Sequence, residues 1–179
     1  MMIRLFVALE LPETVRDRLV GLQGGVPGAR WAHDDQLHLT LRFIGDVTED
    51  VGHDVDDALL SIRAPGFVLE LAGVGEFGGK NPRALWAGVR ANGALVHLQK
   101  KIETALQRIR LEAETRKFSP HVTLARMRGA PREKVVQFLS HYGLFASGPF
   151  KIERFVLFSS HQGSGGSVYH PERIYPLTA

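Results

Sequence analysis

The chain has 179 residues and a mass of 19.8 kDa, with 44% apolar residues, 23% charged residues and a net charge of +3. This composition is typical of one globular domain, and it excludes a repeat array, an intrinsically disordered chain and a bilayer-spanning protein. The chain has no cysteine, which excludes disulfides, zinc–thiolate sites and cysteine nucleophiles, and with no leader cleavage site visible we expect a cytoplasmic protein.

The first half of the chain alternates between strand-like and helix-like segments. An apolar run of strand length covers Ile3 to Leu9, and Pro12 opens a helix after it. A two-residue hydrophobic period predicts a second strand over Gln36 to Ile44. Thr48 is the expected N-cap of a second helix, and Phe67 to Ala72 is the next predicted strand.

The second half of the chain repeats the order strand, helix, strand, helix, strand. Its first predicted elements are a strand over Arg83 to Val89, a helix over Leu95 to Ile109 and a strand over His121 to Ala125. Pro131 then opens a second helix. Two strands follow, over Phe150 to Phe158 and Val168 to Leu177, and the turn Gly163 to Gly166 lies between them. The repeated order predicts an internal duplication with pseudo-twofold symmetry.

Each half carries the same pattern at the same place: histidine, apolar residue, threonine, apolar residue. The two copies are His38-Leu39-Thr40-Leu41 and His121-Val122-Thr123-Leu124. Residues two apart in a strand share a face, so each strand presents one imidazole and one hydroxyl together, with the apolar residues on the other side. A twofold relation between the strands would place the two imidazoles on opposite sides of one small ligand. Two matching copies are poorly explained by chance, so we favour a catalytic role.

Two histidines suit phosphoryl transfer, because an in-line displacement removes a proton from the attacking oxygen and gives one to the leaving oxygen. Imidazole titrates near pH 6.5, so both of its protonation states are available at neutral pH. Thr40 and Thr123 are expected to bind the non-bridging phosphate oxygens, which gain charge in the transition state. This arrangement requires no metal ion.

Strand alternation makes different predictions for the two arginines that follow the motifs. Arg42 falls on the same face as His38 and Thr40, which makes it the expected phosphate contact. Strict alternation places Arg126 on the face opposite His121, unless the strand twists or ends before this residue.

These motifs resemble those of the 2H phosphoesterase superfamily, which is named for its two His-x-Thr-x motifs. Within it, the chain is similar to the bacterial and archaeal RNA 2′,3′-cyclic phosphodiesterases that were first described as 2′-5′ RNA ligases. The likeness covers nearly the whole chain. The segments that carry it are Arg4 to Ala8, His38 to Gly45, Asn81 to Val89, Phe118 to Arg126, and a closing hairpin with Phe158, Tyr169 and Leu177.

The resemblance implies an α+β fold in which residues 1–179 form one domain of two intertwined lobes, with antiparallel sheets lining a central cleft and helices outside. It also implies hydrolysis of a 2′,3′-cyclic phosphate at an RNA 3′ end to a 2′-phosphomonoester. We expect a monomer that needs neither cofactor nor metal. By the same resemblance, His38 is the general acid, His121 is the general base, Phe6 stacks on the terminal base, and Arg126 matches the arginine that ends the second motif.

Three alternatives remain open from the sequence. ATP-independent joining of RNA ends would use the same histidines in the reverse reaction. Small cyclic phosphates or 2′-5′ linked oligonucleotides are alternative substrates, because rim contacts decide the substrate. A non-catalytic RNA-binding module would use the basic segment from Lys100 to Lys134, which holds ten basic and four acidic residues.

Overall fold

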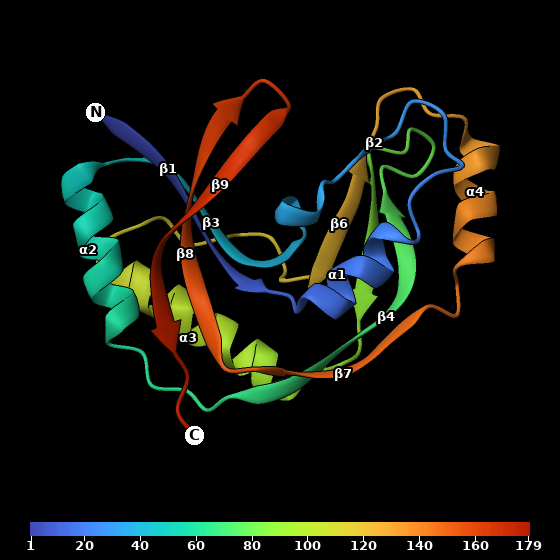
Figure 1. Cartoon of the computed structure of the whole chain (residues 1–179). Helices are drawn as coiled ribbons and strands as arrows, with labels where there is room; N and C mark the ends of the chain where they lie inside the picture. The colour runs from blue at the N-terminus through green and yellow to red at the C-terminus, as the bar shows by residue number, and fades with distance from the viewer.

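One antiparallel sheet of nine strands organises the protein, in a computed structural model that describes residues 1–179 (Figure 1). The strands are β1 (Met2–Glu10), β2 (Arg30–Trp31), β3 (His38–Thr48), β4 (Phe67–Phe77), β5 (Ala84–Val89), β6 (His121–Arg126), β7 (Ala146–Ile152), β8 (Arg154–Gly163) and β9 (Gly166–Pro176). The helices are α1 (Glu13–Val20), α2 (Glu49–Leu60), α3 (Gly93–Arg108) and α4 (Arg132–His141), with a 3₁₀ turn, η1, at Asp34–Gln36.

The order of the strands has the symmetry expected of a duplicated chain. The sheet runs β7-β4-β5-β6-β3-β1-β8-β9, with the short β2 beside β6. The two motif strands, β6 and β3, lie at the centre, and each is flanked by the first strand of its own half, β5 or β1. The predicted α+β fold with two related halves is therefore confirmed.

The two halves of the sheet meet at one residue pair. Leu39 of β3 lies opposite Val122 of β6 in antiparallel register, and both side chains are completely buried. Each is the second residue of its motif, so the pseudo-twofold axis passes between them. We call this pairing the seam.

The sheet divides at the seam into one lobe with β7, β4, β5 and β6 and another with β3, β1, β8 and β9. Each lobe is covered on its outer side by two helices, and one of these two helices follows a strand of the other lobe in the chain (Figure 1). Helix α3 follows β5 but packs on α2 and β3, across the seam. Helix α1 follows β1 but lies on the other lobe, where the guanidinium of Arg18 is 5.5 Å from the centre of the Phe145 ring beside β7. This exchange of helices interlocks the two lobes.

Hydrophobic residues separate onto the two faces of the sheet with the two-residue period of a strand. In β1, Leu5, Val7 and Leu9 belong to a core of 34 buried residues between the sheet and the helices. Phe6 and Ala8 face the other way, into a smaller cluster with Val156, Phe158 and Tyr169. We call the side that carries this smaller cluster the inner face.

The helix starts agree with the sequence. The Thr48 hydroxyl accepts a hydrogen bond from the Val51 N–H at 3.4 Å, which confirms the predicted N-cap of α2. Asn92 caps α3 in the same way, with its side chain 3.0 Å from the Leu95 nitrogen. No helix is both long enough and apolar enough to span a bilayer.

The prediction of one strand over Phe150 to Phe158 is wrong. Strand β7 pairs with β4 in one lobe, whereas β8 pairs with β1 in the other. Glu153 and the next residue, Arg154, are both exposed, so the two-residue alternation of burial breaks at the point where the chain crosses between lobes. The predicted hairpin is present, with Gly163 paired to Gly166.

Candidate active site

The seam brings the two predicted motifs together. Continuing the antiparallel register one step on either side of the Leu39–Val122 pair places His38 opposite Thr123, and His121 opposite the threonine of the first motif. Directly opposite residues in an antiparallel pair point to the same face. Each imidazole therefore lies on the inner face, across from the hydroxyl of the other motif.

Both imidazoles are held by the same kind of hydrogen bond. The Nδ1 of His38 is 2.8 Å from the carbonyl oxygen of Gln36, and the Nδ1 of His121 is 2.7 Å from that of Ser119. A carbonyl oxygen only accepts, so in each ring Nδ1 carries the proton and donates it. This leaves Nε2 as the nitrogen that can exchange a proton with a ligand. The Nε2 of His38 is 2.9 Å from Oγ1 of Thr40.

His38 has a strongly perturbed pKa. Burial lowers the pKa of His38 to about 4, the hydrogen bond to the Gln36 carbonyl opposes this shift, and the positive charges of Arg126 and His121 lower the pKa further. His38 is therefore neutral at pH 7 in the protein alone.

Aromatic rings surround His38. Phe6 is 3% exposed, and its ring centre lies 5.0 Å from that of His38 and 5.3 Å from that of Phe158, on which it stacks. Tyr169 meets both Phe6 and His38 edge-on, at 5.0 and 5.3 Å. The structure thus places Phe6 next to the histidine but beneath other rings. Phe43, 6.1 Å from Phe6, is the exposed ring of this group.

His121 has aromatic neighbours that the sequence did not predict. The Phe77 ring meets His121 edge-on at 4.9 Å, and Trp86 lies 6.2 Å away. Trp86 covers Gly75, where an added Cβ would lie 2.2 Å from the indole. The sequence signal for this packing is Gly75, because a glycine inside a strand often marks a close approach.

The structure corrects the prediction for Arg42. A β-bulge at Leu41 shifts the pairing of β3 with β1, so two consecutive residues, Leu41 and Arg42, face the core. Arg42 is 7% exposed and its Nε donates to the Glu103 carboxylate of α3 at 2.6 Å. A second nitrogen bonds the Glu112 carbonyl. These partners bind Arg42 on the helix side, away from the two histidines.

The equivalent bulge brings Arg126 back to the inner face. In β6 the pairing shifts at Leu124, and Leu124 and Ala125 are both buried while Arg126 is exposed. Arg126 is the fifth residue after His121, and Phe43 is the fifth residue after His38, so the two residues occupy equivalent positions in β6 and β3. Arg126 therefore lies in the same row of the inner face as Phe43, and it acts on the His38 pKa from there.

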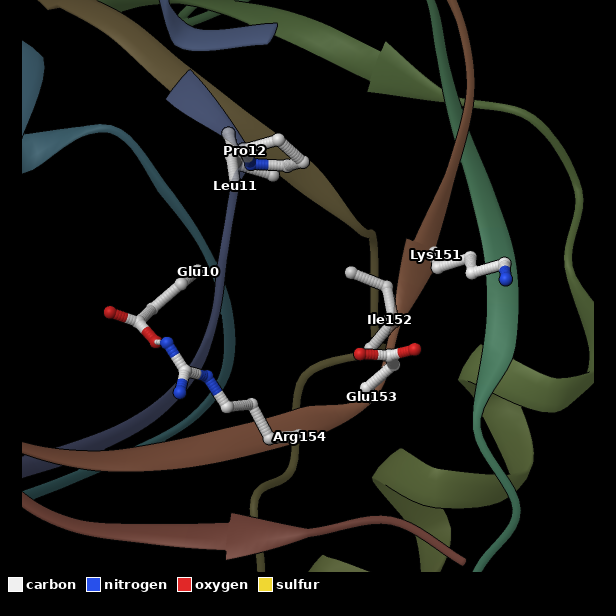
Figure 2. A pocket seen from close by; sticks show the side chains of 7 residues that line it. All are labelled: Glu10, Leu11, Pro12, Lys151, Ile152, Glu153 and Arg154. Atoms are coloured by element: carbon white, nitrogen blue, oxygen red, sulfur yellow. Dashed lines mark ion pairs between the residues drawn. The ribbon is translucent and has the colours of Figure 1, made fainter. Parts of the chain in front are cut away.

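A separate hollow of about 290 Å³ opens where β1 and β8 diverge (Figure 2). Glu10 and Arg154 point toward each other across one side of it and form an ion pair at 3.1 Å. Its remaining lining residues are Leu11, Pro12, Lys151, Ile152 and Glu153. None of the predicted site residues lines this hollow. No group of three or more His, Cys, Asp or Glu side chains is arranged to hold a metal ion.

Known proteins resemble the chain over almost its full length. The family model described as the 2′-5′ RNA ligase superfamily matches residues 11–164. The RNA 2′,3′-cyclic phosphodiesterase of Aeropyrum pernix is 35% identical over 158 residues, which is 87% of this chain and 88% of that protein. The enzyme of the same name from Escherichia coli is 28% identical and covers 98% of this chain and 97% of its own length.

Solved structures agree with the sequence relatives. The crystal structure of E. coli LigT complexed with 3′-AMP superposes with a TM-score of 0.83 at 26% identity, and the match covers 100% of both chains. The family match, the relative above 30% identity and the shared fold all lead to one assignment. The chain belongs to the 2′-5′ RNA ligase superfamily.

Proposed function

We propose that this protein hydrolyses the 2′,3′-cyclic phosphate at the 3′ end of RNA to a 2′-phosphomonoester and a free 3′-hydroxyl. The observation that carries the proposal is the pair of His-x-Thr motifs at the seam, with both Nδ1 atoms held by backbone carbonyls. Nε2 is then the proton-exchanging nitrogen of each ring, and that of His38 lies beside the Thr40 hydroxyl. The relatives from A. pernix and E. coli are named for this activity.

Each histidine carries one proton transfer in the proposed reaction. Nε2 of His121 takes a proton from water as the water oxygen bonds to phosphorus. The bond between phosphorus and the 3′ oxygen breaks, and His38 gives the proton on its Nε2 to that oxygen. One imidazole gains a proton and the other loses one, so the net consumption is a single water molecule. This division of roles follows the family resemblance.

The low pKa of His38 sets a condition on this role. An acid must be protonated when the leaving oxygen departs, but the pKa of His38 lies at about 4 in the protein alone. A phosphate anion beside the imidazole favours its charged form and raises its pKa. We therefore infer that anion binding, rather than the free protein, charges His38.

The remaining residues bind the substrate in this proposal. Thr40 and Thr123 donate hydrogen bonds to the non-bridging oxygens, and Arg126 stabilises the negative charge that grows there. Phe6 forms the base of an aromatic wall for the terminal nucleobase, which also includes the exposed ring of Phe43. Stacking of this kind tolerates different bases.

The first experiment is incubation of the purified protein with a short RNA ending in a 2′,3′-cyclic phosphate, in EDTA, followed by identification of the terminal phosphate. We expect a 2′-phosphate, and a loss of turnover of at least ~10² in H38A and H121A, as is typical for removal of a general acid or base. His97→Ala, at an exposed histidine of α3, is the matched control. Normal activity in either variant, or inhibition by EDTA, would contradict the mechanism.

A substrate with sulfur in place of the 3′ oxygen separates the two roles. A thiolate leaves without protonation, so this substrate should restore turnover to H38A but not to H121A. Rescue of H121A instead would reverse the assignment of acid and base.

A second activity is favoured by the description of the family itself, 2′-5′ RNA ligase. The reverse of the proposed reaction joins a 5′-hydroxyl RNA to the cyclic phosphate through the same two histidines. Adding a 5′-hydroxyl oligonucleotide in excess tests this reaction, and we expect hydrolysis to dominate when RNA ends are dilute.

We further propose that the protein acts as a cytoplasmic monomer and that residues 1–179 fold as one domain. Light scattering coupled to size-exclusion chromatography tests the oligomeric state. One cooperative unfolding transition, seen equally by fluorescence and circular dichroism, would support a single domain because the lobes share the seam and exchange helices.

A further inference from the structure

Four arginines surround a second and larger hollow at the end of the inner face. This hollow has a volume of about 830 Å³ and lies where β2, the start of β5 and the end of β6 meet. Its charged side chains are Arg30, Arg83, Arg126 and Arg128, and Asn81 adds an amide. No acidic residue lines it. We call it the arginine pocket.

The sheet register explains why these arginines converge. Arg30 of β2 lies directly opposite Arg126 of β6, so both side chains point to the inner face. On the other side of β6, the Met127 N–H donates to the carbonyl oxygen of Arg83 at 2.9 Å, which ties that residue to the same end of the strand. Arg128 follows two residues after Arg126.

The arginine pocket is positively charged and not neutralised by the protein. Seven of the sixteen arginines in the chain form ion pairs with carboxylates, and none of the four pocket arginines is among them. Four like charges gathered without counter-charges repel one another and attract anions. Guanidinium groups also match the geometry of phosphate oxygens, to which they donate two hydrogen bonds at once.

Arg126 connects the arginine pocket to the histidine site. It lines the pocket, and its charge also lowers the pKa of His38. The aromatic rings near His38 come from β1, β3, β8 and β9, in the other lobe. A nucleotide at the histidines thus has the aromatic rings around His38 in one lobe and the arginines in the other, where Phe77 and Trp86 also pack beside His121.

We infer that the arginine pocket binds the phosphodiester groups of the RNA strand immediately upstream of the terminal cyclic phosphate. This inference rests on the proposed function, because it takes the terminal phosphate to lie between the histidines. The hollow is within the usual size range of ligand sites, roughly 300–1,000 Å³, which gives room for more than one phosphate group. The pocket thereby makes an RNA end a better substrate than a cyclic mononucleotide.

Two substrates with the same terminal nucleotide test the inference. One is adenosine 2′,3′-cyclic phosphate, and the other is a trinucleotide that ends in the same group. The triple variant R30Q/R83Q/R128Q removes three pocket charges and keeps Arg126. R108Q, at an exposed arginine without an ion pair on α3, is the matched control.

We expect the wild-type protein to have a higher kcat/KM for the trinucleotide than for the mononucleotide. The triple variant should lower the trinucleotide value by roughly 30-fold, from about 3-fold for each of three exposed charge contacts, and leave the mononucleotide value within 2-fold of wild type. The slope of log KM against log salt for the trinucleotide should fall by about 2, since each contact to a single-strand phosphate contributes about 0.7.

The outcomes separate this inference from the proposed function. If the wild-type protein hydrolyses both substrates equally, or the triple variant loses both activities equally, the upstream role of the pocket is refuted while the hydrolase activity stands. If the wild-type protein hydrolyses neither substrate, the proposed function fails. In that case, the affinity for a labelled trinucleotide with a terminal 2′-phosphate tests whether the arginine pocket binds RNA. Equal affinity of the wild type and the triple variant would refute this role of the pocket, independently of turnover.

Discussion

The buried imidazole of His38 predicts a specific loss of stability in mild acid. The folded protein holds the pKa of His38 at about 4, against about 6.5 for a solvated histidine in the unfolded chain. Between these values the unfolded chain binds a proton that the folded protein does not, so the free energy of unfolding falls as the pH falls from 6.5 to 4. Above pH 6.5 both states are neutral and this contribution is absent.

The size of the effect follows from the two pKa values. At pH 5 the linkage relation gives a loss of about 2 kcal/mol relative to pH 7.5, rising to about 3 kcal/mol near pH 4. H38Q keeps a polar side chain but cannot titrate. Other titrating groups are common to both proteins, so they cancel in the difference between wild type and variant.

Urea unfolding of wild type and H38Q at pH 7.5, 6.5, 5.5 and 5.0 measures this difference. We expect the stability of the wild type relative to the variant to decline by about 2 kcal/mol over the series. A difference that stays constant within about 0.5 kcal/mol would refute the lowered pKa. A saturating 2′-phosphorylated mononucleotide should move the titration upward, because the anion favours the charged imidazole.

Three further changes test other parts of the structure. Gly75→Ala should destabilise the protein by about 1–3 kcal/mol in urea unfolding and lower its activity, because the new methyl group displaces Trp86, whereas Gly165→Ala, in open space, should do neither. Arg42→Met should cost about 2–3 kcal/mol of stability, because it removes the buried cation that pairs with the partly buried Glu103 carboxylate. A fall in kcat with unchanged stability would contradict that structural role. Arg126→Gln should do the reverse, with kcat/KM reduced by about 10² and an unchanged urea midpoint.

The sequence predicted the features that depend on local pattern. That the two motif strands pair directly was not predicted. The succession of strands and helices, the cap at Thr48 and the presence of one His-x-Thr motif in a strand of each half all follow from periodicity and duplication. These features depend on residues close together in the chain, where the two-residue and 3.6-residue periods apply directly.

The roles of Arg42 and Arg126 were not predictable by alternation, because alternation assumes an unbroken strand. Each motif strand contains one extra residue, Leu41 or Leu124. It reverses the face of the sheet to which the later side chains of that strand point. The bulges depend on how the neighbouring strand pairs, which is a long-range property. The arginine pocket also depends on long-range pairing, because β2 places Arg30 opposite Arg126 of β6.

The pseudo-twofold axis through the seam has a consequence for the direction of the chemistry. A duplicated scaffold gives its two imidazoles the same backbone anchor and the same neighbouring hydroxyl, so by itself it cannot distinguish donor from acceptor. A reaction that makes one bond and breaks another has a polarity, and the residues that break the symmetry must supply it. Phe43 and Arg126 occupy equivalent positions with opposite chemistry, one an exposed ring and the other a cation. This divergence, together with the different rings around the two histidines, distinguishes the two ends of the site.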